Sequence, residues 1–420
     1  MEIRKFIAAL LMLFLLAGCA PKSAPVDTRS GEAVSADSTH TPTQVQELTL
    51  AVVAEDGFVQ PALLSAVTAF NAADADYRVN IVKYASVAEL NTHITAGESA
   101  DIFRVDGLPF ESFANKGLFE DLNPYFDADP KMDLVPAFRK AMSTGEQLYK
   151  ISPSFHAWTL TGLSDVVGDA QGWTFDELEQ IIADNSATVT DVIAQQWDKE
   201  AALTFLLYQN LDEYIDWENG KALFNTEDFK NLLEFINTFP KSTTGNADWF
   251  EQLRTGKSIV IFSALGAVEG FTNFDSIMGG EIVAKGFPSV RKSSGVLASA
   301  NFELACSATS ANPKGAFAFI KSALETNADA YSMPFLKSQF DAAINTAMTE
   351  PTLLKEPMTN AQYEKFMKFL EGIDTLSGMS QPIQAIIHEE TASYFAGQKD
   401  VEEVCRIIQS RTNLYIGEQG

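Results

Sequence analysis

The sequence is poor in the residues that build metal centres and catalytic sites. Its 420 residues include three cysteines and four histidines, and the histidines are scattered along the chain. The HExxH, GxSxG, GxGxxG and P-loop patterns are all missing, so common metalloprotease, serine-hydrolase and nucleotide-binding sites are not indicated. We therefore expect no cofactor, no metal and no catalytic residues.

One acidic stretch, residues 127–133, has a partial metal signal. Asp127, Asp129 and Asp133 are spaced in the manner of a calcium-binding loop. Such a loop needs Gly at its sixth position and Glu at its twelfth, and this stretch has neither. The expectation that no metal binds therefore stands.

Basic residues are also scarce. The chain has 30 Lys and Arg against 56 Asp and Glu, which gives a net charge of −26. Binding to nucleic acid requires clustered basic side chains that neutralise phosphates, so we expect no nucleic-acid partner. The simplest interpretation of the acidity is solubility and self-repulsion, and we expect a monomer.

The N-terminus carries a targeting signal. Arg4 and Lys5 precede an apolar run, Phe6 to Leu16, which is too short to span a membrane and is typical of a secretory signal. It ends in Leu-Ala-Gly-Cys at residues 16–19, which resembles the lipobox of bacterial lipoproteins. The resemblance implies that residues 1–18 are removed and that Cys19 is lipidated. An ordinary signal peptide with a chance cysteine is the alternative.

Residues 19–46 are rich in Ala, Ser, Thr and Pro and have almost no large apolar side chains. Such a segment cannot bury enough surface to offset the entropy lost on ordering. We expect a flexible tether that keeps the protein at the cell membrane. It would face outward, at the cell surface of a Gram-positive host or in the periplasm of another.

The other two cysteines have the features of small buried hydrophobic residues. Cys306 lies in a strand-like run, and Cys405 lies on an apolar helical stripe. A disulfide between them is allowed in an exported protein and stays an open alternative. Neither has the spacing of a metal site.

From residue 47 onward, strand-like and helix-like segments alternate. Alternation of this kind predicts an α/β fold with a mainly parallel sheet, whose ligand lies outside the carboxyl ends of the strands. Those predicted strand ends carry Glu55, Asp56, Phe58, Asp106 and Phe110. These five are the first candidate ligand-binding residues, although both Asp residues could instead cap the helices that follow.

A strand-like stretch, residues 148–162, then carries three candidates close together: Phe155, His156 and Trp158. We expect this stretch to cross from one lobe to the next and to face whatever the lobes enclose. Because adjacent residues of a strand face opposite ways, at most one of Phe155 and His156 is expected to line a cleft. Trp158 could face either the cleft or the core.

The sequence pattern of the second half of the chain predicts further helices and strands. Thr174 and Glu177 have the spacing of a capping box, and Asn312 followed by Pro313 predicts a helix start. Trp249, on a predicted helix over 246–255, is a candidate for ligand contact or for core packing. Asn301, near a second extended segment at 299–305, completes the candidate set.

Several stretches together resemble extracellular solute-binding protein family 1, the maltose-binding-protein-like substrate-binding lipoproteins of carbohydrate ABC transporters. These stretches are ADIF with ANKGLFEDLNPYF, LYKISPSF, GWTFDELEQII, RTGKSIVIF, and the C-terminal IIHEETASYFAGQKDVEEVCRIIQSRTNLYIGE. The resemblance implies a two-lobed periplasmic-binding-protein-like fold of type II, with lobes joined by hinge strands. Lobe one would be 47–154 plus 303–337, and lobe two 155–302 plus 338–420.

The resemblance also implies a function. The protein would capture an extracellular sugar or oligosaccharide between the lobes and deliver it to the permease subunits of an ABC importer. The chain departs from the family pattern at Ser152, at Ala264-Leu265-Gly266 and at His156, where Pro, a stacking Trp and a sugar-binding Glu are usual. An exported polysaccharide-acting enzyme with paired carboxylates, and a surface sensor or adhesin with the same fold, are the alternatives.

Overall fold

A computed structural model describes residues 45–420. Within this range it leaves out residues 55–56, 218, 244–247, 327–331, 352–355, 377–380 and 420. The predicted signal peptide, Cys19 and nearly all of the predicted tether lie outside the described residues, as do the candidates Glu55 and Asp56.

The first sheet has four strands in the order β11-β3-β1-β2. They are β1 (Gln46–Val53), β2 (Tyr77–Tyr84), β3 (Ile102–Arg104) and β11 (Leu304–Cys306). β1 pairs in parallel with both β2 and β3, and β11 pairs antiparallel with β3. The sheet is therefore mainly parallel, as the alternating pattern predicts.

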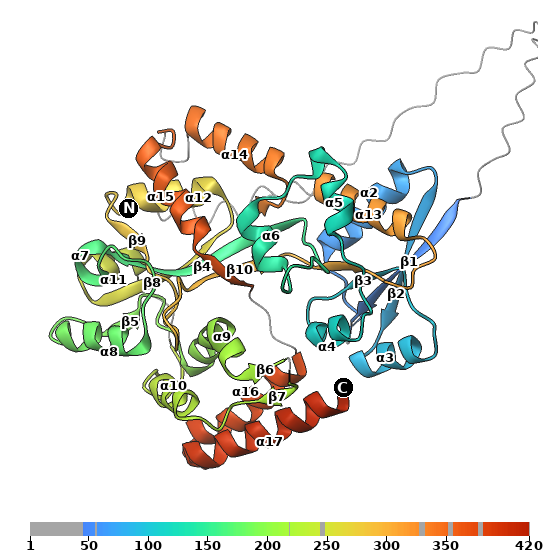
Figure 1. Cartoon of the computed structure of the whole chain (residues 1–420). Coiled ribbons are helices and arrows are strands. Elements are labelled where there is room, and N and C mark those ends of the chain that lie inside the picture. Colours follow the sequence, from blue (N-terminus) through green and yellow to red (C-terminus); the bar gives the residue numbers. More distant parts are fainter. Residues whose placement is uncertain are drawn as a thin grey trace, which may run out of the picture. The chain divides into compact units, whose positions relative to one another are not determined.

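Helices cover both faces of this sheet (Figure 1). They are α2 (Pro61–Ala73) and α13 (Pro313–Thr326) on one face, and α3 (Val87–Thr95) and α4 (Phe110–Asn115) on the other. Leu48 and Leu50 of β1 share a buried core with Phe70 and Phe319, whose rings meet edge to face at 5.5 Å. Ala51 points the opposite way, into the core under α3 and α4. The period-two alternation of β1 thus buries both of its faces.

The second sheet is built around β4, its longest strand. Its strands are β4 (Ser154–Leu163), β5 (Asp191–Ile193), β8 (Ser258–Leu265), β9 (Ile282–Ala284), β10 (Val296–Ala300), β12 (Met333–Pro334) and β13 (Ile373–Leu376). The main order is β13-β10-β4-β8-β5, and β9 and β12 also pair with β4. A separate hairpin joins β6 (Ile215–Asp216) to β7 (Lys221–Ala222).

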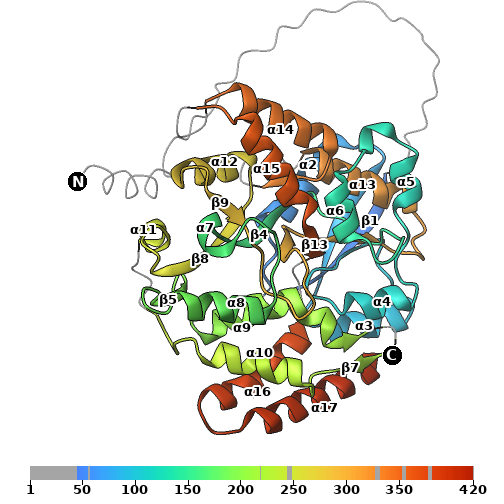
Figure 2. The same cartoon turned by 60° about the vertical axis from the view of Figure 1, so that its left-hand side comes forward.

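Helices lie on both sides of these strands (Figure 2). One side has α8 (Phe175–Asp184), α9 (Lys199–Asn210), α10 (Glu227–Asn237), α16 (Gln381–Phe395) and α17 (Val401–Gln419). The other has α11 (Trp249–Arg254), α12 (Val268–Ile277), α14 (Lys337–Thr349) and α15 (Asn360–Glu371). Along β4, Phe155 and Ala157 enter the core that is shared with the first sheet, whereas Trp158 and Leu160 enter the core under α9.

Five short elements complete the fold, and the first three of them link β3 of the first sheet to β4 of the second. They are α5 (Asn123–Asp127), η1 (Pro130–Met132), α6 (Pro136–Met142), α7 (Ser164–Val167) and η2 (Leu211–Glu213). In this region Asp129 caps η1 and pairs with Lys321 at 2.6 Å, and Asp127 pairs with Arg139 at 2.9 Å. These carboxylates of the calcium-like stretch are therefore used in capping and ion pairs.

Three local predictions are confirmed. Thr174 and Glu177 form the capping box of α8, and α13 begins at Pro313. Cys306 and Cys405 are both buried, in different cores. They are free cysteines, so the disulfide alternative is wrong. The helix predicted over 246–255 is shorter, because Asp248 caps it and it runs over Trp249–Arg254.

The chain passes between the sheets at three places: from α6 to β4, from β10 back to β11, and from α13 to β12. Backbone hydrogen bonds hold the first two passages together. Ile151 and Leu304 exchange a pair at 3.0 and 2.8 Å, and Asn301 N–H donates to the Ser154 carbonyl at 3.1 Å. Phe335, after the third passage, donates to the Pro153 carbonyl at 3.3 Å.

Candidate functional site

A cavity of about 350 Å³ lies where the ends of both sheets meet. One part of its lining comes from the elements that follow β3, namely the loop after β3, the start of α4 and the end of α6. A second part of the lining comes from the η2 helix, the loop after β6, and β13. The passage from β10 to β11 completes it. Its charged side chains are Asp106, Glu111, Lys140, Lys150, Asp212 and Glu303, and its aromatic ones are Phe110 and Trp217.

The loop after β3 brings the first of these groups to the cavity. Gly107 has φ = +84°, a left-handed conformation that a residue with a side chain rarely adopts, and the chain turns there into α4. The turn leaves Asp106 at the carboxyl end of the parallel strands and Glu111 in the first turn of α4. This is the sheet edge where α/β folds bind ligands.

Asp106 is held by two partners. The Arg104 guanidinium donates through Nε to both carboxylate oxygens of Asp106, at 3.0 and 2.8 Å, and a second nitrogen adds a further contact. The backbone N–H of Glu303 also donates to Asp106, at 3.1 Å. Asp106 therefore joins the β3 edge to the β10–β11 passage.

Lys150 and Glu303 form a second ion pair in the cavity wall. Lys150 Nζ lies 2.7 Å from the Glu303 carboxylate, and the two side chains are 14% and 7% exposed. The same ammonium group lies 4.4 Å from the centre of the Phe110 ring, which is within cation–π range. Burial raises the pKa of Glu303, and the Lys150 ammonium opposes that rise.

Glu111 and Asp212 are different, because neither has an ion-pair partner within the described part of the chain. Burial raises the pKa of Glu111, Asp212 and Glu303 raise it further, and Lys150 lowers it. Burial also raises the pKa of Asp212, and a hydrogen bond from Trp217 lowers it. Asp212 is an exposed residue, and the walls of the cavity remove only part of the water around its carboxyl group, which disfavours the charged form.

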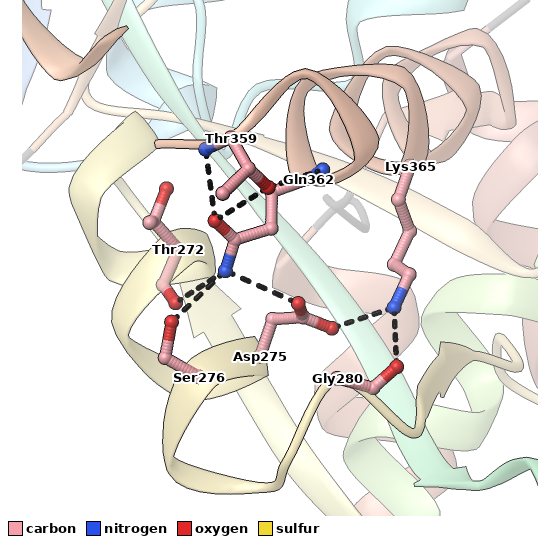
Figure 3. Close-up of polar contacts among 7 residues, drawn as sticks. All are labelled: Thr272, Asp275, Ser276, Gly280, Thr359, Gln362 and Lys365. Atoms are coloured by element: carbon pink, nitrogen blue, oxygen red, sulfur yellow. Dashed lines mark hydrogen bonds and ion pairs between the residues drawn. The ribbon is translucent and has the colours of Figure 1, made fainter. Parts of the chain in front are cut away.

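A second polar cluster joins α12 to α15 (Figure 3). The Gln362 amide donates to Ser276 at 2.9 Å and to Asp275 at 3.2 Å, and Lys365 donates to Asp275 at 2.7 Å and to the Gly280 carbonyl at 2.9 Å. Because the buried Asp275 carboxylate is matched on both oxygens, this cluster clamps two helices and leaves no charge uncompensated.

Within the described ranges, the structure contains no grouping of three or more His, Cys, Asp or Glu side chains that could hold a metal ion. Over the same ranges, no helix has both the length and the apolar character that a membrane span requires.

Comparison with protein families identifies the chain. Residues 59–329, more than half of its length, match the family of bacterial extracellular solute-binding proteins. The chain belongs to this family. It is thus an ABC transporter solute-binding protein, a non-catalytic binding receptor that acts in the extracellular or periplasmic space. A search of curated proteins finds no match to the sequence.

Solved structures of other solute-binding proteins share the fold. The sugar-binding protein MalE from the phytopathogen Xanthomonas citri gives a TM-score of 0.53 at 13% identity, covering 89% of this chain and 98% of its own. A periplasmic solute-binding protein from Pectobacterium atrosepticum gives 0.51 at 15% identity, with 89% and 100% covered. A family 1 extracellular solute-binding protein from Alicyclobacillus acidocaldarius gives 0.50 at 15%, with 89% and 98% covered. The α/β periplasmic-binding-protein-like fold expected from the sequence is confirmed.

Two of the predicted site residues of this solute-binding protein line the cavity. They are Asp106 and Phe110, which lie at the strand end and at the start of α4. Phe110 is largely buried and stacks on Phe119 at 5.3 Å, so only part of its ring is available to a ligand.

The three candidates on the crossing strand lie in different surroundings. Phe155 is 1% exposed and packs against Phe138 and Phe335, so we do not place it in a binding site. Trp158 is partly buried against Phe205. His156 lies beside Ser299 of β10, and neither His156 nor Trp158 is among the described residues that line the cavity.

The remaining described candidates are not among the residues that line the cavity. Phe58 and Trp249 are exposed, at 57% and 43%. Asn301 donates through its side chain to Ser154 and Ser332, next to the passages between the sheets. The structure thus brings Asp106 and Phe110 together and leaves these three apart from them.

Sequence reasoning missed most of the cavity. Glu111 directly follows the predicted Phe110, so the same strand-end argument could have included it. Lys150 and Glu303 form a pair only through a long-range contact between two passages. Asp212 and Trp217 lie in the loop around η2 and β6, where the acidic and aromatic residues of LDEYIDW follow no helical or strand period. A Trp in a stretch that has no regular period was the signal that could have pointed to this loop.

Proposed function

We propose that this solute-binding protein captures a sugar or oligosaccharide in the cavity and delivers it to the permease subunits of an ABC importer. The observation that supports this most is the placement of Phe110 and Trp217 beside Asp106, Glu111 and Asp212. Aromatic faces cover the C–H faces of a sugar ring, and carboxylates accept hydrogen bonds from its hydroxyls. A volume of about 350 Å³ suits a small saccharide.

We also propose that ligand binding closes two lobes, 47–154 plus 303–337 and 155–302 plus 338–420. Bending would be confined to residues near 152–157 and 299–305, because few-residue passages absorb such changes. The hydrogen-bonded passages around Ile151 and Leu304 support this assignment. Small-angle scattering should show a smaller radius of gyration with a bound ligand, and equal radii in both states would count against closure.

The N-terminal proposal is that Cys19 is lipidated and that residues 19–46 form the tether to the cell membrane. It is supported by the Leu-Ala-Gly-Cys sequence and the composition of the segment. Two acyl chains, at about 0.8 kcal/mol per buried CH₂, would retain the protein stably. Cys19→Ser should move it to the soluble fraction, and unchanged retention at the membrane would refute the anchor.

The sugar proposal is tested by thermal shift over a panel of mono- and oligosaccharides, followed by calorimetry with the best one. A true ligand raises the apparent melting temperature by mass action. Trp217→Ala should then weaken binding by about 1–2 kcal/mol, or about tenfold, because a stacking face is lost. Trp249→Ala, which changes an exposed Trp away from the cavity, is the matched control. If no saccharide shifts the transition, the sugar proposal is wrong.

A further inference from the structure

The charges that line the cavity do not balance one another. Two of its carboxylates are matched within the protein, Asp106 by Arg104 and Glu303 by Lys150. Glu111 and Asp212 are left without an ion-pair partner in the described chain. The remaining cation of the lining, Lys140, is exposed at the end of α6.

The two unmatched carboxyl groups come from opposite parts of the wall. Glu111 lies in the first turn of α4, beside the four-stranded sheet, and Asp212 lies in η2, which follows α9 on the second sheet. They are near enough for the charge of Asp212 to raise the pKa of Glu111. Two like charges that line one cavity repel each other, and the Lys150 ammonium group offsets part of that repulsion at Glu111.

A positively charged group that enters the space between Glu111 and Asp212 would offset the rest of that repulsion. A divalent metal ion is not expected in this space, because the described residues contain no cluster of three or more metal-ligating side chains. Lys150 offsets only part of the Glu111 charge, because its ammonium group is paired with Glu303 and lies over the Phe110 ring. The Trp217 indole donates to Asp212 and gives the same space an aromatic face, which also attracts a cation.

We propose that the natural ligand carries a protonated amine, which binds between the Glu111 and Asp212 carboxylates. This rests on the proposed function, and together they specify an amino sugar. Each carboxylate accepts a charge-assisted hydrogen bond from the ammonium group, which is about twice as strong as a neutral one. The net charge of −26 adds a long-range field that steers cationic solutes toward the protein.

Calorimetry on the whole protein tests this with matched ligands. We would compare glucose, N-acetylglucosamine and glucosamine, and disaccharides with the same three substituents, since each series differs only in hydroxyl, acetamide or amine at one carbon. Spermidine serves as an amine without a sugar. We expect the amine to bind at least about tenfold more tightly than its neutral counterparts. The preference should disappear in Glu111→Gln and Asp212→Asn, so that in each variant the amine binds no more tightly than its neutral counterparts.

Glu179→Gln is the matched control. Glu179 is an exposed residue of α8 beside a different acidic cavity, so the change removes the same charge from the overall field without touching the site. It should leave the amine preference intact; if it removes the preference as fully as Glu111→Gln does, the field of the whole protein is responsible and the proposal fails.

The remaining outcomes separate the two proposals. Neutral sugars that bind as tightly as amines would overturn the amine site and leave the sugar function standing. Spermidine binding that depends on Glu111, with no sugar bound, would overturn the sugar function and support the amine site. Binding of neither class would overturn both.

Discussion

The side-chain amide of Asn301 donates to the Ser154 hydroxyl across 2.6 Å. The same amide reaches the Ser332 hydroxyl at 3.3 Å, and Ser332 in turn donates to Ser154 at 3.0 Å. These residues lie beside the three passages between the sheets, one residue at each. A single small polar cluster therefore holds all three passages together.

Asn301→Ala should destabilise the protein by about 1–3 kcal/mol, because it leaves the buried Ser154 and Ser332 hydroxyls with fewer partners. Urea unfolding measures the change, with Asn360→Ala on the exposed start of α15 as the control. An unfolding midpoint equal to that of the parent protein would show that the cluster contributes nothing to stability.

Lys150→Met should destabilise by about 3–5 kcal/mol, because it strands the buried Glu303 carboxylate without its partner. Adding Glu303→Gln should recover a large part of that loss, since the uncompensated charge is gone. The double-mutant cycle, measured by urea unfolding, isolates the coupling between the two residues. Additive effects of the two substitutions would mean that the ion pair has no role.

Glu111→Gln should make the unliganded protein more stable at neutral pH. The pKa of Glu111 is raised by burial and by Asp212 and Glu303, against the opposing Lys150, so the folded state holds the proton more tightly than the unfolded state does. This favours folding below the ordinary pKa of a Glu, and the benefit is lost as pH rises through the raised pKa. Melting temperatures across the acidic-to-neutral range should converge at the acidic end. Glu364→Gln, an exposed change on α15, is the control, and a parent and variant with parallel curves would contradict the prediction.

Trp158→Ala should cost stability of about 2–4 kcal/mol and leave ligand affinity unchanged in protein that remains folded. Trp158 packs against Phe205, Tyr208 and Phe262 with ring centres 5.5, 6.4 and 6.1 Å apart. From the sequence alone, Trp158 could face either the cleft, as a stacking surface for a ligand, or the core. Chemical denaturation measures the loss of stability, and calorimetry on the same preparation measures the ligand affinity. A large loss of affinity in well-folded variant protein would show that Trp158 stacks on the ligand.

The sequence predicted the elements whose pattern is local. The β1 strand, the capping box of α8 and the start of α13 each follow from a few neighbouring residues. Asp106 and Phe110 followed from the rule that ligands lie at the carboxyl ends of parallel strands.

The other features of the site depend on contacts between residues that are far apart in the sequence. Strand alternation shows that Phe155 and Trp158 face opposite ways, but both sides of β4 are covered by helices, so alternation alone cannot say which faces a cleft. The Lys150–Glu303 pair joins residues that are 153 positions apart. Asp212 and Trp217 reach the cavity only because the η2–β6 loop is carried there by the fold of the second sheet.

The strand β11 completes the first sheet but lies far along the sequence from the other three strands. Leu304 pairs with Arg104, so β3 lacks one of its neighbours until about 200 further residues have been synthesised. The core above β1 also waits for Phe319 of α13. Contacts this distant close slowly, because a long loop must be ordered first. We therefore expect the first sheet to stay incomplete until β11 and α13 have been synthesised. Pulsed hydrogen exchange should show β1 and β3 unprotected in a fragment that stops before residue 304, and early protection there would contradict this order of folding.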